Sequence, residues 1–201
     1  MRRYLTIAVL SFLSFAGVAS AQKFAVKTNS LYWGTATPNV GLEVAMAPRW
    51  TFELAGGYNP WTLEKEENVK AKHFLVTPEV RYWFCESFQG HFIGVHGNYT
   101  QFNVSGIHIP EVFIPVDSDG YFIDDLQHMR SQGWAAGAGL TYGYATPIGR
   151  RWNIEFNLGL GFWYTQYDRF ESRPCGLFQD SISNWVFGPT DLGVSFIYMI
   201  K

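Results

Sequence analysis

Apolar and polar residues alternate along most of the chain from Ala25 onward. The clearest stretch runs from Trp152 to Phe162, where Trp, Ile, Phe and Leu take every second position and Asn, Glu and Gly lie between them. Successive side chains of a β-strand point to opposite faces. This stretch therefore predicts a strand with one apolar face and one polar face.

The alternation recurs often enough to predict about eight strands. They are expected near residues 24–33, 39–47, 50–59, 73–84, 91–104, 132–146, 152–166 and 189–200. The best-defined apolar faces comprise Val40, Leu42, Val44 and Met46; Trp50, Phe52, Leu54 and Tyr58; Phe74, Val76, Val80, Tyr82 and Phe84; Trp134, Leu140, Tyr142 and Tyr144; and Leu192, Val194, Phe196, Tyr198 and Ile200. The first and fifth strands alternate less regularly, so their facing stays open.

The start of the chain predicts export. Met1-Arg2-Arg3, an apolar run and the small residues Ala19-Ser20-Ala21 indicate a signal peptide over residues 1–21. Residues 22–201 then form one domain, which lacks the roughly 18 consecutive apolar residues of a membrane-spanning helix. With no amphipathic helix to cover the strands, we predict an all-β fold. It is an eight-stranded antiparallel transmembrane β-barrel, an up-and-down meander with lipid outside and a filled polar lumen.

Composition agrees with a membrane location. Aromatic residues make up 18% of the chain and charged residues 16%, whereas soluble domains carry about 25% charged residues. A β-sandwich with an aromatic core is the alternative. We expect the cell outer membrane, with its lipid and lipopolysaccharide around the protein and the barrel-assembly machinery as a partner during biogenesis. The net charge of −2 gives no indication of a nucleic-acid partner.

The connections alternate in length, as periplasmic turns and external loops do. Short connections are expected at 47–49, 85–90 and 147–151, and long ones at 60–72, 105–131 and 168–188. Aromatic residues near the strand ends predict two girdles. The periplasmic girdle contains Trp50, Tyr82, Phe84, Phe92, Tyr144, Trp152 and Tyr198, and the outer one contains Tyr32, Trp33, Tyr58, Trp61, Tyr99, Trp134 and Tyr164.

The predicted inward faces collect ionisable residues: Lys27, Glu43, Glu53, Glu79, Arg81 and Glu155. Buried charges are costly unless they are paired, so we expect ion pairs from Arg81 and Lys27 to the glutamates. Polar neighbours are Asn29, Asn98, Asn153, Asn157 and His96. An eight-stranded barrel is narrow enough for side chains to fill. A structural plug is therefore favoured over a catalytic carboxylate pair, because a plug gives no substrate access.

The long 105–131 connection mixes apolar and acidic residues, and its interaction candidates are Ile109, Phe113, Asp117, Asp119 and Phe122. They suit contact with another outer-membrane protein, or a loop packed on itself. The run Asp117-Ser118-Asp119-Gly120 resembles the start of a calcium loop but lacks its terminal Glu. The mixed charges of 64–72 fit a solvated loop, with lipopolysaccharide phosphate contact as an alternative. We predict no metal and no cofactor.

The leading function is non-enzymatic: a surface interaction or accessory protein that acts through the loops at 105–131 and 168–188. A lipid A-modifying enzyme is an alternative. Such an enzyme needs a His, a Ser and an acid near the outer boundary. Candidates are His73, His108, His128, Ser105, Ser131 and Asp168, although neither G-x-S-x-G nor H-E-x-x-H occurs. A narrow channel for small solutes is a further alternative.

Several segments carry a resemblance: Lys27 to Trp33, Thr37 to Glu43, Gly56 to Trp61, Pro78 to Trp83, Gly90 to His96, Gly139 to Tyr144 and Phe187 to Thr190. Together they resemble a domain-of-unknown-function family of outer-membrane barrels from Bacteroides-type bacteria. The resemblance implies an eight-stranded barrel and no assigned activity. Members often carry C-x-x-C in the last external loop, whereas here Cys175 stands alone with Ser172 at the other position. The predicted topology puts Cys85 and Cys175 on opposite sides of the membrane, so no disulfide between them is expected.

Overall fold

The computed structural model describes residues 24–64, 69–106, 129–171 and 176–200. Apart from one short helix, these residues form antiparallel β-structure. The elements in chain order are β1 (Phe24–Asn29), α2 (Leu31–Gly34), β2 (Asn39–Ala47), β3 (Trp50–Asn59), β4 (Thr62–Glu64), β5 (Val69–Trp83), β6 (Gly90–Ser105), β7 (Met129–Pro147), β8 (Trp152–Glu171) and β9 (Phe178–Ile200).

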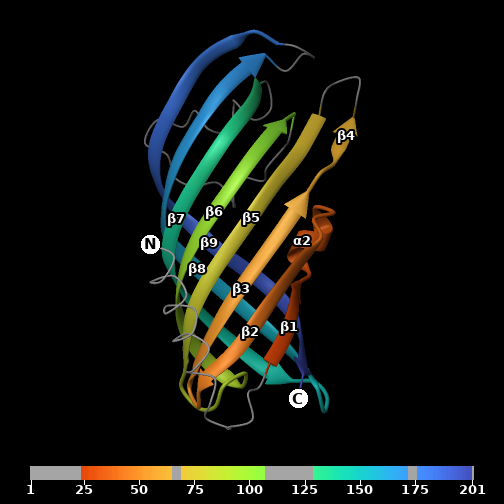
Figure 1. Ribbon diagram of the computed structural model, residues 1–201, viewed down its shortest axis with the longest axis vertical. Coiled ribbons are helices and arrows are strands. Elements are labelled where there is room, and N and C mark those ends of the chain that lie inside the picture. Colours follow the sequence, from red (N-terminus) through yellow and green to blue (C-terminus); the bar gives the residue numbers. More distant parts are fainter. Residues whose placement is uncertain (1–23, 65–68, 107–128, 172–175, 201) are drawn as a thin grey trace, which may run out of the picture.

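Eight of the described strands close into a ring (Figure 1). Consecutive strands pair as an antiparallel meander from β1 to β3, from β3 to β5, and from β5 to β9. The ring closes where β1 pairs with β9, with Phe24 opposite Ile200 and Asn29 opposite Ser195. The short strand β4 pairs with β5 outside this ring. Both strand ends at Phe24 and Ile200 lie at one end of the ring, which we call the basal end; the opposite end is the apical end.

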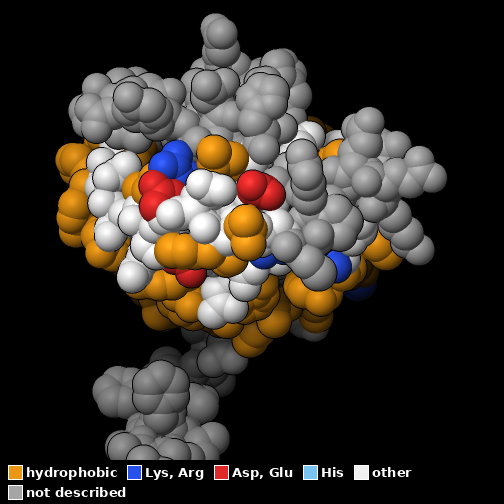
Figure 2. Space-filling view, turned by 90° about the horizontal axis from the view of Figure 1, so that it is seen from above, with side chains coloured by type: hydrophobic (Ala, Val, Ile, Leu, Met, Phe, Trp, Pro, Cys, Tyr) orange, Lys and Arg blue, Asp and Glu red, His pale blue; other side chains and the backbone are white. Residues whose placement is uncertain are grey.

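The two faces of the ring differ in chemistry as the alternation predicts. Large apolar side chains point outward; Leu140, for example, is 68% exposed. Charged and polar side chains point inward and are buried, including Lys27, Glu43 and Arg81. Seen from above, hydrophobic atoms line the left and lower edge of the described surface, while acidic and other polar atoms are concentrated nearer its middle (Figure 2). No helix among the described residues is long and apolar enough to cross a bilayer.

The strand bounds differ from the predicted ones mainly in three places, and one girdle residue faces the other way. In the first place, the predicted 60–72 loop contains β4 and the start of β5 at Val69. β1 ends at Asn29, because Ser30 leads into the turn of α2 instead of extending the strand to residue 33. The predicted loop at 168–188 is wrong. β8 continues to Glu171 and β9 begins at Phe178, so most of that region is a paired hairpin. Phe92, expected in a girdle, points inward and is fully buried.

Two groups of predicted residues lie outside the described part of the chain. One is the signal peptide at 1–21. The other comprises the loop candidates Ile109, Phe113, Asp117, Asp119 and Phe122.

The wall of the ring is uneven in height. β1 has 6 residues, whereas β9 has 23. β7, β8 and β9 consequently rise beyond the short strands at the apical end and form one tall side of the ring (Figure 1).

Candidate functional site: a layer of charge inside the ring

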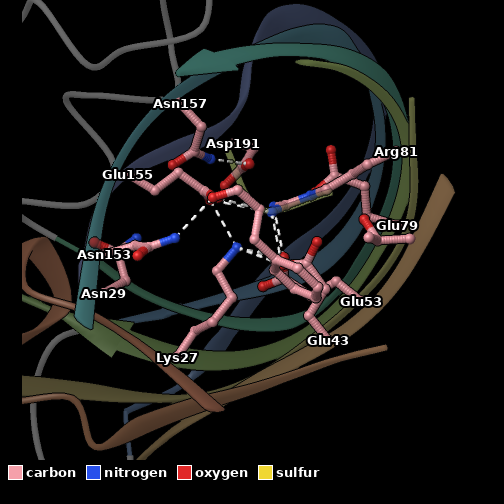
Figure 3. A network of polar contacts seen from close by, with 12 residues as sticks. Lys27, Asn29, Glu43, Glu53, Glu79, Arg81, Asn153, Glu155, Asn157 and Asp191 are labelled. Atoms are coloured by element: carbon pink, nitrogen blue, oxygen red, sulfur yellow. Dashed lines mark hydrogen bonds and ion pairs between the residues drawn. The ribbon is translucent and has the colours of Figure 1, made fainter. Parts of the chain in front are cut away.

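Three glutamates lie directly opposite one another on neighbouring strands. Glu43 on β2 pairs in register with Glu53 on β3, which pairs with Glu79 on β5. Like charges directly opposite each other on a sheet are destabilising. The arrangement is therefore stable only if cations reach all three carboxylates, and two inward-pointing bases do so (Figure 3).

The Lys27 ammonium lies among three of the glutamates. Its Nζ is 3.0 Å from Glu43 Oε2, 2.8 Å from Glu53 Oε2 and 2.7 Å from Glu155 Oε1. Because Lys27 comes from β1, these ion pairs link the first strand to β2, β3 and β8. The opposite residue on β2 is Gly41, where a Cβ would lie 2.9 Å from Glu53 Oε1. The small residue thus leaves room for the carboxylate.

Arg81 extends the layer to a fourth glutamate. Its Nε donates to Glu79 Oε2 at 2.7 Å, and Nη2 lies 2.6 Å from Glu53 Oε2. Nη1 contacts Glu155 Oε1 at 3.1 Å and Glu43 Oε2 at 3.3 Å. The planar guanidinium presents five donors, which explains how one side chain bridges carboxylates from four strands.

The sequence-predicted interior residues are therefore all brought together. Lys27, Glu43, Glu53, Glu79, Arg81 and Glu155 form one buried ion-pair layer, with Glu43 fully buried. Four carboxylates face two bases, so each base is shared and neither can be lost without leaving buried negative charge uncompensated. Among the described residues, Glu43 Oε1 and Glu79 Oε1 are buried carboxylate oxygens without a hydrogen-bond partner. The two bases offset part of the negative charge within the wall of strands, and two of the four carboxylates formally remain without a matching cation.

An apolar plug closes the interior on the basal side of this layer. Trp83 and Phe92 pack with ring centroids 4.7 Å apart, and Arg81 lies 4.6 Å from the centroid of Phe92. Phe88, from the turn between β5 and β6, packs on Ala25 and Ile197. The turn thus folds under the ring and inserts an aromatic side chain.

The inserted turn is fixed by its backbone. The Phe88 carbonyl accepts a hydrogen bond from Asn153 Nδ2 at 2.7 Å, and Ser87 Oγ donates to the Pro48 carbonyl at 2.9 Å. Phe88 itself has φ of 68°, a strained value for a bulky residue. Sequence reasoning predicted a short turn here and missed the plug, because alternation says nothing about how a turn folds back.

On the apical side, neutral polar groups continue the filling. His96 Nδ1 lies 2.7 Å from Thr141 Oγ1, and Asn98 Nδ2 donates to the Thr190 carbonyl at 2.8 Å. Asn157 Nδ2 donates a hydrogen bond to Asp191, an inward-pointing acid that the sequence analysis does not select. The alternation from Leu192 to Ile200 already places Asp191 on the inward face, because the β-bulge at Pro189 to Asp191 lies on the other side of this stretch.

A small cavity separates this polar layer from the ion pairs. It has a volume of about 50 Å³ and is lined by polar groups that include Asn29, Thr77 and Asp191. At 10–15 Å³ for each water, that is room for roughly four water molecules. The interior therefore holds space for solvent beside the ion-pair layer.

Two of the candidates for lipid A chemistry in the described ranges, His73 and Asp168, hydrogen-bond to residues outside the candidate set. His73 Nδ1 contacts the Ala71 carbonyl of its own strand, while Asp168 accepts a hydrogen bond from Ser181. Ser131 is buried on the inward side, whereas Asp168 is exposed. His108 and His128 lie outside the described residues. Within the described ranges, no group of three or more His, Cys, Asp or Glu side chains is arranged to hold a metal.

A closed antiparallel ring with an apolar exterior and a charged, filled interior is the class of protein that these observations define. The chain belongs to the family described as protein of unknown function DUF3575, whose model matches residues 5–200. The predicted membership of a domain-of-unknown-function family is thus confirmed. No curated protein matches the chain.

Proposed function

We propose that this protein is a β-barrel of the outer membrane and serves as a closed, non-conducting anchor for its apical strands and loops. The observation that carries the proposal is its inverted polarity. Large apolar side chains cover the outside of a closed ring, while ion pairs are buried inside it. Lipid tolerates only structures whose backbone groups are all paired internally, and a closed ring of strands meets that requirement.

Two belts of aromatic side chains support membrane placement. The basal belt consists of contacting outward rings near the basal turns: Trp50, Tyr82, Phe84, His91, Tyr142, Tyr144, Trp152 and Tyr198. The apical belt runs across four neighbouring strands through Tyr99, Trp134, Tyr164 and Trp185. Amphipathic rings favour the two interfaces of a bilayer.

The spacing of the belts fits a bilayer. Trp134 and Tyr144 are ten residues apart on β7. At about 3.4 Å per residue and a strand tilt of about 40°, the band between them is roughly 25 Å high. That is the height of the apolar band of outer-membrane barrels. Beyond the apical belt, the outward positions of β8 become polar, with Gln166 and Asp168.

The filled interior favours an anchoring role over the alternative of a solute channel. The Phe88 plug and the ion-pair layer occupy successive levels of the interior, so solutes have no continuous path past them. We expect the tall apical side of β7, β8 and β9, with the loops beside it, to contact another outer-membrane protein or lipopolysaccharide. This role requires no catalytic group.

Site-directed spin labelling tests the membrane placement. Leu140 lies within the apolar band and is 68% exposed, and Ile148 lies in a basal turn and is 58% exposed. In vesicles, oxygen should accelerate the spin relaxation of a nitroxide at Leu140→Cys, because oxygen concentrates in lipid. A water-soluble nickel chelate should have little effect on that relaxation, because it stays outside the lipid. The matched label at Ile148→Cys should show the reverse, with both native cysteines replaced by Ser. Equal nickel access at the two positions would refute the membrane placement.

Two further measurements test the anchoring role. Planar bilayers containing the protein should show no stepwise conductance, and regular steps would favour the channel. Deleting residues 107–128 should abolish co-purification of any apical partner from native membranes; binding that survives would contradict a role for that loop.

A further inference from the structure

Two clusters at the basal end have the same composition and geometry, and neither is needed to explain the fold. The first, Arg49–Trp50–Tyr82, joins the turn before β3 to β5. The second, Arg151–Trp152–Tyr198, joins the turn before β8 to β9. In both, the Trp and the Tyr are cross-strand partners, and their rings are 5.1 Å and 5.0 Å apart with interplanar angles of 60° and 58°.

The backbone repeats the match. The Arg49 carbonyl accepts a hydrogen bond from Trp83 N at 2.8 Å, and the Arg151 carbonyl accepts one from Met199 N at 2.9 Å. In each case the donor is the residue after the cluster's Tyr. The clusters lie on opposite sides of the ring, because two strands separate them in either direction, β6 and β7 on one side and β1 and β2 on the other.

In the second cluster the arginine is hydrogen-bonded to the phenol, with Arg151 Nη1 3.3 Å from the Tyr198 hydroxyl. In the first cluster the interaction with Tyr82 raises the pKa of the Arg49 guanidinium further above its usual value. Both arginines are exposed, and within the described ranges no carboxylate lies within ion-pair distance of either. The described basal turns contain Arg49, Arg150 and Arg151 against one acid, Glu86.

This geometry suits a phosphodiester. A guanidinium with one N–H bonded to a phenol oxygen keeps further donors in a planar fork that matches phosphate oxygens. The phenol keeps its own O–H to donate. The adjoining Trp lies in the basal belt, where lipid headgroups would be.

We propose that each Arg–Trp–Tyr cluster binds the phosphate of one phospholipid in the leaflet at the basal end. The inference rests on the proposed membrane placement and adds specific lipid sites to it. Two sites on opposite sides would fix the height and tilt of the ring relative to that leaflet.

Native mass spectrometry of the whole protein, released from micelles that contain phosphatidylglycerol, tests the inference. We expect up to two retained phosphatidylglycerol molecules. Arg49→Gln and Arg151→Gln should each remove one and weaken binding at that site about fivefold, the effect of one basic residue near an anionic surface. The double variant should retain neither. A galactosyl diacylglycerol, which has no phosphate, should not be retained.

Arg150→Gln is the matched control, since Arg150 is exposed in the same turn as Arg151 and is not part of either cluster. It should retain both lipids, whereas Tyr82→Phe should weaken one site without changing its rings. Three outcomes would overturn the inference. The first is that Arg49→Gln and Arg151→Gln retain as much lipid as the unmodified protein, and the second is that Arg150→Gln loses as much lipid as they do. The third outcome is retention of the galactolipid. The Leu140 spin label separates failure of the lipid sites from failure of the membrane placement. The label would stay shielded from nickel if only the lipid sites were wrong, and it would be accessible to nickel if the membrane placement were wrong.

Discussion

Two ion-pair systems in this molecule have similar chemistry and opposite surroundings. Arg81 and Lys27 hold four glutamates inside the ring, where the side chains involved are 0–9% exposed. Arg169 on β8 and Asp180 on β9 form a two-pronged pair near the apical hairpin, where Asp180 is 46% exposed. The apical pair competes with water for every hydrogen bond, whereas the interior charges have only each other.

The difference teaches that ion-pair geometry alone does not determine what a pair contributes. Exposed pairs gain little, because water solvates the separated charges nearly as well and salt screens them. Buried charges that lose one partner keep the cost of desolvation with nothing to offset it. The interior layer should therefore respond strongly to substitution and weakly to salt, and the apical pair should do the reverse.

Arg81→Met should have the largest effect. It leaves four buried carboxylates with Lys27 alone, and breaking such a buried network costs about 3–5 kcal/mol. Urea unfolding in detergent, followed by tryptophan fluorescence, should show the loss in both 0.1 M and 1 M NaCl. Arg150→Met, in an exposed turn, is the control and should leave the midpoint unchanged. An unaltered midpoint in Arg81→Met would mean that the layer contributes nothing to stability.

Phe88→Ala should have a comparable or slightly smaller effect for a different reason. Removing a buried aromatic ring leaves a cavity and costs about 3 kcal/mol. The effect should be insensitive to salt, because the lost contacts are apolar. Differential scanning calorimetry in detergent measures it. An unchanged unfolding temperature in Phe88→Ala would show that the plug contributes nothing to stability.

Gly143→Ala should cost about 1–3 kcal/mol, the range for overpacking a filled interior. A Cβ at this position would overlap the ring of Phe92, which cannot move without disturbing Trp83. The control is Gly56→Ala, whose added Cβ would make only an ordinary contact, 3.5 Å from the Leu75 carbonyl oxygen. Thermal unfolding of both variants gives the comparison, and equal stability would show that the plug adapts to an added methyl group.

Asp180→Asn should have the smallest effect, near the resolution of an unfolding titration. The hydrogen bond from Arg169 lowers the pKa of Asp180. The pair therefore contributes above the usual aspartate pKa of about 4, and this contribution is lost as the pH falls through the lowered pKa. The difference from the unmodified protein should appear at pH 7 in low salt and vanish in 1 M NaCl, where the screening length is about 3 Å. A difference in stability that persists in high salt would show that the Arg169–Asp180 pair behaves like the buried ion pairs.

The strands and the facing of their residues follow from the sequence, because a period of two is a local property. Alternation alone assigns Glu155 to the interior. The first strand alternates less regularly, so the inward position of Lys27, which is 128 residues from Glu155, is established by the structure. The pairing of Glu43 with Glu53 and Glu79 could not be foreseen in detail, because register depends on how neighbouring strands meet.

Other parts escaped prediction for equally physical reasons. Phe92 resembles a girdle residue in the sequence because apolar residues occur on both faces of its strand. Its inward position becomes clear only from its packing against Trp83. The paired hairpin beyond Asp168 was mistaken for a loop, since polar residues outside the apolar band interrupt the alternation without interrupting the pairing. Asp191, by contrast, lies on the inward face that the alternation from Leu192 to Ile200 predicts, and it could have been selected from the sequence.

The closing pair of strands sets an order of events in time. Phe24 and Ile200 are 200 − 24 = 176 residues apart, and β1 contributes only 6 residues to the closure. Contacts between distant parts of a chain form late, because loop closure costs entropy before any contact compensates it. Lys27 lies on that short strand, so we expect the glutamates to stay hydrated until the ring closes around them. A chain in transit would remain compatible with water, and closing the ring would make it compatible with lipid.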